Sequence, residues 1–252
     1  MGFIEQLKEK ARANRKKIVL PEGMDERTYA AAEQIVREDF ADIILLATDE
    51  EVEKFGKEYD IKGITIINPR KYEKTEAYAE EFYELRKAKG MTREQAYAML
   101  ISDYMYFACM MVNAGDADGV VSGACHSSAN TLRPSLQIIK TKPGSKLVSA
   151  FFVICVPNKK MGADGVFVMA DCGLNQNPNP VQLADIAASS AESFEYLVGE
   201  KARVAMLSHS SYGSAAHPDV TKVVEATKIA KKEYPQFLID GELQTDAALV
   251  PE

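Results

Sequence analysis

Small and hydroxyl-bearing residues are concentrated in residues 122–134, SGACHSSANTLRP, directly after a short apolar run. Small side chains let a ligand approach the backbone. Free N–H groups at the start of a following helix can hold an anion together with the hydroxyls of Ser127, Ser128 and Thr131. Arg133 adds a permanent positive charge whose planar guanidinium suits phosphate or carboxylate. The segment therefore predicts an anion-binding turn, and the alternative is an ordinary capped helix with a surface arginine.

A second loop with the same chemistry lies at residues 208–215, SHSSYGSA, between the apolar run VAML and a predicted helix. Its serines and its glycine favour an anion-binding turn for the same physical reason. The candidate binding residues in this loop are Ser208, Ser210, Ser211, Gly213 and Ser214. The alternative is a serine-rich loop that only caps the helix that follows.

Two charged residues are further candidates, each with two interpretations. Asp171 follows the apolar run VFVMA. Its carboxylate either points into a cleft or fixes its own loop by accepting hydrogen bonds from backbone N–H groups. Arg86 lies in the basic cluster RKAKG at a helix end, where it either interacts favourably with the helix dipole or docks a nucleotide phosphate. The acidic stretch from Asp240 to Asp246 is expected to form a polar loop at a cleft rim, with Mg²⁺ binding as the alternative.

Several motifs with well-defined chemistry are missing from the sequence. It contains no GxGxxG after a strand, no GxxxxGK(S/T) and no HExxH, so no dinucleotide site, P-loop or metal site is predicted. The four cysteines form no CxxC pair and are expected to be reduced, mostly buried thiols. The histidines, His126, His209 and His217, are expected to be capping or loop residues.

An alternation of strand and helix patterns must position these loops. Apolar runs predict strands at Lys17 to Pro21, Asp42 to Thr48, Ile64 to Asn68, Gly119 to Ser122, Leu147 to Val156, Val166 to Ala170, Arg203 to Leu207 and Phe237 to Asp240. Helices are predicted at Phe3 to Arg15, from the cap Asp25 to Glu38, and at Asp49 to Tyr59, Lys71 to Lys89, Thr92 to Asn113, Leu132 to Ile139, Pro180 to Gly199 and Pro218 to Glu233. This order indicates an α/β fold with a largely parallel sheet. Open parallel sheets bind ligands beyond the carboxyl ends of their strands, which is where the loops at 122–134 and 208–215 and the loop that begins at Asp171 fall.

The chain of 252 residues predicts one or two domains. The polar segment KTKPGSK, residues 140–146, contains Pro-Gly and is expected to separate a first α/β domain (1–144) from a second (145–252). The second domain has few helices for its strands and is expected to be incomplete.

Composition and charge exclude other classes. A net charge of −7 argues against a nucleic-acid coat protein and against a binder of anionic membranes. No apolar run approaches the ~18 residues of a membrane span. The charged start of the chain, Met1 to Lys17, lacks the apolar core of a signal peptide. A cytoplasmic protein is therefore expected.

The candidate loops and their surroundings resemble the phosphate acetyltransferase / phosphate butyryltransferase family. The matching stretches are LRKAKGMTREQA (Leu85 to Ala96), GDADGVVSGACHSSANTLRPSLQIIKTKPG (Gly115 to Gly144), FVMADCGLNQNPNPVQLADIA (Phe167 to Ala187), RVAMLSHSSYGSA (Arg203 to Ala215) and IDGELQTDAALVPE (Ile239 to Glu252). They occur in the family's order and spacing. The residues of these stretches resemble phosphate acetyltransferases more closely than phosphate butyryltransferases, chiefly in NTLRPSLQIIKTKPG and DGELQTDAAL.

The resemblance implies a reaction and a set of roles. The reaction is acetyl-CoA + phosphate ⇌ acetyl phosphate + CoA, with no metal or bound cofactor. The implied fold is the two-domain α/β fold of the isocitrate and isopropylmalate dehydrogenases, with the active site between the domains and a homodimer joined through the second domain. Arg133 and Ser128 take the catalytic roles. Substrate binding is assigned to Ser127, Thr131, Ser208, Ser210, Ser211, Gly213, Ser214, Asp171 and Arg86.

The chain also departs from the family. Family members usually continue beyond the position of Glu252, and the resemblance places a Ser-Arg pair and a catalytic aspartate in that continuation. We therefore expect the 252-residue chain alone to be inactive. The alternatives are a phosphate butyryltransferase, a truncated non-catalytic module that binds CoA or phosphate and dimerises, and a decarboxylating hydroxy-acid dehydrogenase of similar two-domain shape.

Overall fold

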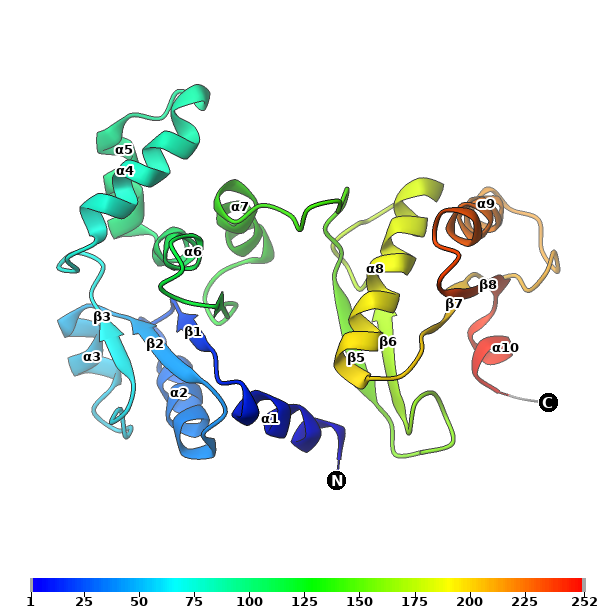
Figure 1. Cartoon of the computed structure of the whole chain (residues 1–252), viewed down its shortest axis with the longest axis horizontal. Helices are drawn as coiled ribbons and strands as arrows, with labels where there is room; N and C mark the ends of the chain where they lie inside the picture. The colour runs from blue at the N-terminus through cyan, green and yellow to red at the C-terminus, as the bar shows by residue number, and fades with distance from the viewer. Residues whose placement is uncertain (1, 251–252) are drawn as a thin grey trace. The chain divides into compact units, whose positions relative to one another are not determined.

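The computed structural model describes residues 2–250 (Figure 1). Met1, at the start of the charged N-terminal stretch, lies outside the described residues, as do Pro251 and Glu252, at the end of the last matching stretch. The chain forms two compact units, one spanning Ile4–Lys140 and the other containing Gly2, Phe3 and the residues from Thr141 to Val250. The boundary expected after Gly144 stays a prediction.

The first unit is built on a parallel sheet with the strand order β3-β2-β1-β4. Its strands are β1 (Lys17–Leu20), β2 (Asp42–Leu46), β3 (Thr65–Ile67) and β4 (Gly119–Val120). All three neighbouring pairs are parallel, with Val19 opposite both Ile44 and Val120. The register places the carboxyl ends of β1 and β4 side by side, which brings together two loops about a hundred residues apart in the sequence.

Helices cover both faces of this sheet. The helical elements in this part of the chain are α1 (Phe3–Ala13), α2 (Glu26–Glu38), α3 (Asp49–Phe55), α4 (Thr75–Arg86), the 3₁₀ turn η1 (Lys87–Lys89), α5 (Arg93–Ser102), α6 (Tyr104–Asn113) and α7 (Ser128–Ile138). Along β2, Ile43 and Leu45 pack with Tyr29 of α2, whereas Ile44 and Leu46 pack with the helices α4 to α6. This double burial explains why β2 is continuously apolar after its first residue.

The prediction of one long helix from Thr92 to Asn113 is wrong, because the helix is interrupted at Asp103. Asp103 is extended, with φ −126° and ψ 99°, and its carboxylate accepts a hydrogen bond from the backbone N–H of Met105. It therefore ends α5 and caps α6. The run YMYFACMM at the start of α6 is entirely buried, as expected for a helix that is apolar on all sides.

The second unit contains two separate two-stranded sheets. In one, β5 (Phe151–Cys155) pairs with β6 (Val166–Ala170), and in the other, β7 (Arg203–Leu207) pairs with β8 (Leu238–Leu243). Its helices are α8 (Pro180–Val198), α9 (Pro218–Glu233) and α10 (Thr245–Leu249). Asn179 caps α8 and Gly199 ends it in a left-handed conformation, as the sequence indicates.

Three expectations for the second unit and the thiols need correction. The β5–β6 pair is antiparallel, because the short connection between the two strands holds no helix and cannot make a parallel crossover. The residues from Asp240 to Leu243 extend β8 instead of forming a polar loop. Of the four cysteines, all free, only Cys109 is buried; Cys125 and Cys155 are exposed.

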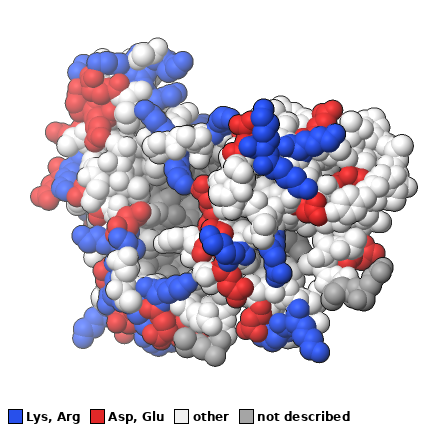
Figure 2. All heavy atoms as spheres, turned by 45° about the vertical axis from the view of Figure 1, so that its right-hand side comes forward, with Lys and Arg blue, Asp and Glu red and all other residues white. Residues whose placement is uncertain are grey.

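Within the described residues, no helix combines the length and apolar character needed to cross a bilayer. The same residues contain no group of three or more histidine, cysteine or acidic side chains arranged to share a metal ion. Basic and acidic side chains are interspersed over the face drawn in Figure 2.

Candidate functional site

Ser127 determines where α7 begins. It has an extended backbone, and its hydroxyl accepts a hydrogen bond from the N–H of Asn130 at 3.3 Å. The helix consequently starts at Ser128, four residues before the predicted Leu132. At a helix start the first backbone N–H groups have no partner within the helix. Among the described residues, no hydrogen-bond acceptor is found for the backbone N–H groups of Ser128 and Ala129.

The N–H groups of the preceding turn, residues 123–126, all have a partner. Those of Gly123 and Ala124 donate to one oxygen of Glu22, each at 2.9 Å, and those of Cys125 and His126 donate to the other at 2.7 and 2.8 Å. Gly123 has a φ of +134°, which other residues rarely adopt. A carboxylate of the chain itself therefore occupies this anion-binding turn.

Glu22 lies two residues after the end of β1 and is 3% exposed. Burial by itself raises the pKa of its carboxyl. The hydrogen bonds from the 123–126 turn and from the His126 side chain outweigh that effect and lower the pKa to about 2. Glu22 is thus a buried anion at neutral pH. The signal that could have found it is an acidic residue between an apolar strand and Gly23, in the stretch KIVLPEG.

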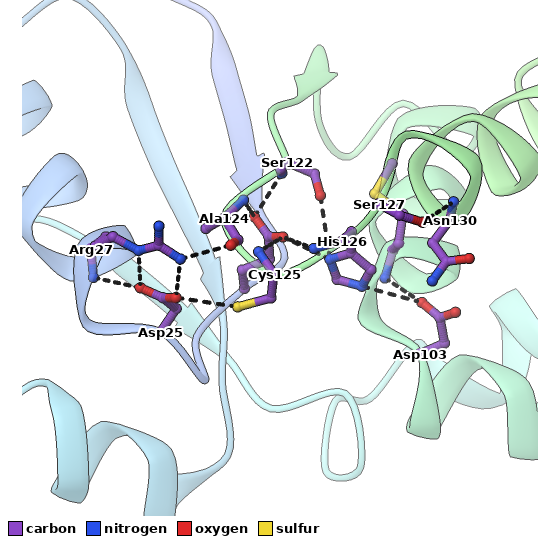
Figure 3. Close-up of polar contacts among 12 residues, drawn as sticks. Asp25, Arg27, Asp103, Ser122, Ala124, Cys125, His126, Ser127 and Asn130 are labelled. Carbon is purple, nitrogen blue, oxygen red and sulfur yellow. Dashed lines mark hydrogen bonds and ion pairs between the residues drawn. The ribbon is translucent and has the colours of Figure 1, made fainter.

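His126 faces Asp103 on one side (Figure 3) and contacts Glu22 through its other ring nitrogen. Its Nδ1 is 2.8 Å from Glu22 Oε1 and its Nε2 is 3.8 Å from Asp103 Oδ1. Its side chain is 14% exposed. The imidazole therefore bridges the loop after β1 and the start of α6. Of the other two histidines, His217 caps α9 as expected by accepting the N–H of Asp219.

A second polar cluster holds the outer side of the 123–126 turn (Figure 3). Arg27 donates two hydrogen bonds to Asp25 and one, at 2.7 Å, to the carbonyl of Ala124. The Cys125 thiol donates to Asp25 at 3.3 Å. The turn is therefore fixed from both sides by groups near the start of α2.

Arg133 does not share a helix face with Ser128. Five residues at about 100° each place it about 140° around the helix axis. Its charge acts instead on the phenol of Tyr106, together with that of Arg86. Burial and the nearby Asp103 raise the pKa of Tyr106, and the two arginines oppose that rise. Arg133 and Arg86 are thus both close enough to Tyr106 for their charges to act on its phenol.

These two arginines have no carboxylate partner among the described residues. The Arg86 Nε is buried and makes no hydrogen bond there. Most other arginines of this unit are paired, for example Arg93 with Glu80. Two guanidinium groups without counter-charges, one of them partly desolvated, favour an anionic ligand with several negative charges.

The serine-rich loop of the second unit also closes on a buried glutamate. Glu242 is 4% exposed. One of its oxygens accepts hydrogen bonds from the N–H of Gly213 at 2.6 Å and from the hydroxyl of Ser210 at 3.2 Å. The bond from Gly213 is the main cause that lowers the Glu242 pKa.

The remaining serines of this loop also bond within it. Ser208 and Ser214 accept the N–H groups of Ser210 and Ser211, and the hydroxyl of Ser211 accepts the N–H of Gln244. The expected free anion-binding turn is therefore occupied from within the chain.

Asp171 adopts the loop-fixing arrangement. Its carboxylate accepts hydrogen bonds from the backbone N–H groups of Gly173 and Leu174 and from the side chain of Asn175. Burial would raise its pKa, but these bonds and one from Ala150 lower it to about 2. Its structural partners leave little of the carboxylate for a ligand.

The parallel sheet with helices on both faces defines an α/β protein, and open sheets of this kind bind ligands beyond the carboxyl ends of their strands. The chain belongs to the phosphate acetyl/butyryl transferase family, because the family described as "Phosphate acetyl/butaryl transferase" matches residues 2–252. The resemblance seen in the sequence is thereby confirmed.

Individual relatives agree with this assignment. The phosphate acetyltransferases of Acetivibrio thermocellus and Thermoanaerobacterium thermosaccharolyticum are 51% and 52% identical over 252 residues, which is all of this chain and 76% of each relative. Among solved structures, a phosphotransacetylase from Streptococcus pyogenes is 43% identical with a TM-score of 0.88, and the EutD phosphotransacetylase from Staphylococcus aureus is 41% identical with a TM-score of 0.87. The match covers 99% of this chain and 74% of each of those chains.

Proposed function

We propose that the chain is a phosphate acetyltransferase, which moves an acetyl group between CoA and inorganic phosphate. The observation that carries this proposal is that Arg86 and Arg133 have no carboxylate partner among residues 2–250, in a chain whose curated relatives bear that name. CoA, acetyl-CoA, acetyl phosphate and phosphate are all anions, so each substrate has a negative group for these cations to bind.

The reaction places three demands on the site. A dianionic nucleophile must be held against the thioester carbonyl, the oxyanion must be stabilised, and the CoA thiolate must regain a proton. In our proposal the unpaired N–H groups of Ser128 and Ala129, with the Ser128 and Thr131 hydroxyls, hold phosphate at the first turn of α7. Arg133 and Arg86 bind the charged groups of the acyl donor, and orientation of both substrates supplies much of the rate.

The second unit contributes less directly in this proposal. Ser210 is buried against Glu242, so its hydroxyl supports the loop and does not reach substrate. Ser208, Ser211, Gly213 and Ser214 remain proposed contacts, and Ser127 and Asp171 act by holding their own segments. We also propose the fold likeness to isocitrate and isopropylmalate dehydrogenases, a homodimer, which sedimentation equilibrium tests, and a cytoplasmic location.

Replacing Arg133 with alanine tests the assignment. Because the guanidinium supplies charge-assisted hydrogen bonds that a neutral side chain cannot, Arg133→Ala is expected to weaken kcat/KM for acetyl-CoA, or the affinity for CoA, by about 100-fold. Calorimetry measures the affinity, and thiol release from acetyl-CoA with phosphate measures turnover. Arg37→Ala, at an exposed arginine on α2, is the matched control. An unchanged affinity and rate in Arg133→Ala would remove Arg133 from the site.

The same assays separate the alternatives. Thiol release that depends on phosphate supports the proposal and contradicts the expectation that these 252 residues alone are inactive. CoA binding without thiol release agrees with that expectation and with a binding module. A higher rate with butyryl-CoA than with acetyl-CoA would favour a phosphate butyryltransferase.

A further inference from the structure

The 123–126 turn and α7 are continuous in the chain, so whatever fixes the turn also fixes the helix start. His126 is followed directly by Ser127, the cap, and by Ser128, the first helical residue. The turn itself is held across the sheet by Glu22, which lies about a hundred residues earlier. The parallel register of β1 and β4 makes this contact possible, with Val121 donating its N–H to the carbonyl of Val19 at 3.0 Å.

The carboxylate of Glu22 uses both oxygens in this contact. Four backbone N–H groups and the His126 imidazole surround it, and an ionised carboxylate offers about four lone-pair sites. The 123–126 turn therefore has no room for a second anion. The N–H groups of Ser128 and Ala129 are left as the neighbouring donors that a substrate anion can use.

The His126 side chain links Glu22, which fills the 123–126 turn, to α6. Its Nδ1 meets Glu22 and its Nε2 faces Asp103, the cap of α6. A donor is needed only at the Nδ1 position to complete the shell around Glu22. An asparagine amide reaches about the same position from the backbone, whereas alanine has no donor there.

We propose that Glu22 is a positioning residue for acetyl transfer, whose carboxylate permanently fills the 123–126 turn and, together with His126, fixes the start of α7 so that the substrate anion binds at Ser128 and Ala129. This inference rests on the proposed function. Glu22 acts through the turn and touches no substrate.

The experiment compares Glu22→Gln with Glu26→Gln, a change at an exposed glutamate four residues away. An amide can accept at only one of the two oxygen positions, and its own N–H groups oppose the remaining backbone donors. Glu22→Gln is expected to weaken acetyl phosphate binding about tenfold or more, measured by calorimetry well below the melting temperature. Amide hydrogen exchange at residues 123–126 is expected to accelerate by a similar factor. Glu26→Gln is expected to match the unmodified chain in both measurements.

Two His126 variants distinguish positioning from general support of the fold. His126→Asn keeps the donor to Glu22 and is expected to retain acetyl phosphate affinity within about threefold, whereas His126→Ala is expected to lose as much as Glu22→Gln. These variants also decide the question if Glu22→Gln does not fold. A Glu22→Gln protein that is folded and binds normally overturns the proposal, as does an equal loss in His126→Asn and His126→Ala.

Failure of the proposed function gives a different result. In that case the unmodified chain itself binds neither CoA nor acetyl phosphate. Amide exchange then still decides the role of Glu22: faster exchange in Glu22→Gln supports the fixing of the turn, and unchanged exchange overturns it.

Discussion

Glu22 and Glu242 each place a buried carboxylate in a turn whose sequence favours an anion site. The same small residues that let a ligand approach the backbone also let a side chain from a neighbouring loop do so. Asp171 has a comparable arrangement on a smaller scale, because it accepts the N–H groups of the loop that it begins. At the residue scale, a turn rich in serine and glycine therefore indicates available N–H groups but not which anion they bind.

Asp171 is expected to make the free energy of unfolding depend on pH. Its folded pKa of about 2 lies below the ordinary value of 3.8, so the stabilisation is fully present above about pH 4 and is lost as the pH falls through about 2. After allowance for solvent screening, Asp171→Asn is expected to lower the unfolding free energy at pH 7 by about 1–2 kcal/mol. Urea unfolding at several pH values measures this. The difference between the two proteins should shrink towards pH 2, and a difference that is constant with pH would contradict the assignment.

Asp103 shows how one capping residue reshapes an element. The apolar spacing from Ala96 to Met111 continues across it, but its carboxylate competes for the N–H of Met105 and ends the helical backbone. The break lets α5 and α6 take different directions, and α6 is then buried on all sides. It also places the Asp103 carboxylate within 3.8 Å of His126, which precedes α7 and the proposed phosphate contacts at its first turn.

The break predicts a specific pattern of stabilities. Asp103→Ala removes the cap and is expected to lower the unfolding free energy by about 1 kcal/mol. Asp103→Asn keeps a good cap and is expected to stay within a few tenths of a kcal/mol of the unmodified chain. Chemical denaturation followed by circular dichroism measures both. Equal losses in the two variants would mean that the charge facing His126, and not the cap, is the stabilising feature.

At the scale of the whole molecule, the chain divides into two compact units, with a boundary between Lys140 and Thr141 in the sequence. The connection between α7 and β5 contains neither helix nor strand, and most of its residues from Lys140 to Gly144 are exposed. It includes lysines at 140 and 146, followed by Thr141 and Leu147. Each unit has its own apolar core, so a break in this connection leaves both cores intact.

Limited digestion with trypsin is expected to cut this connection first, because exposed segments without regular structure fit a protease site most readily. Mass spectrometry of the early fragments should locate the cuts after Lys140 or Lys146. The double change Lys140→Gln with Lys146→Gln should delay the first cleavage. Early cuts inside α8 or α9 would contradict this division of the chain.

Most elements could be predicted from local patterns. β7 and α9 match their predicted ranges, and Asp25, Asn179 and Gly199 act at helix ends as their residue types indicate. The misses have particular causes. The β5–β6 pair is antiparallel because of its short connection, and Asp103 interrupts an otherwise continuous apolar pattern. In both cases the local pattern is present, but a competing local interaction or the length of the connection decides the structure.

The amino-acid sequence by itself determined the family, the α/β class, most strand and helix positions and the two serine-rich turns. These depend on short-range patterns and on sequence motifs shared with relatives. Only the tertiary structure decided that Glu22 fills the first turn and that Glu242 fills the second. Those contacts join residues about thirty to a hundred positions apart. Strand register and helix packing bring them together, and no local spacing encodes either.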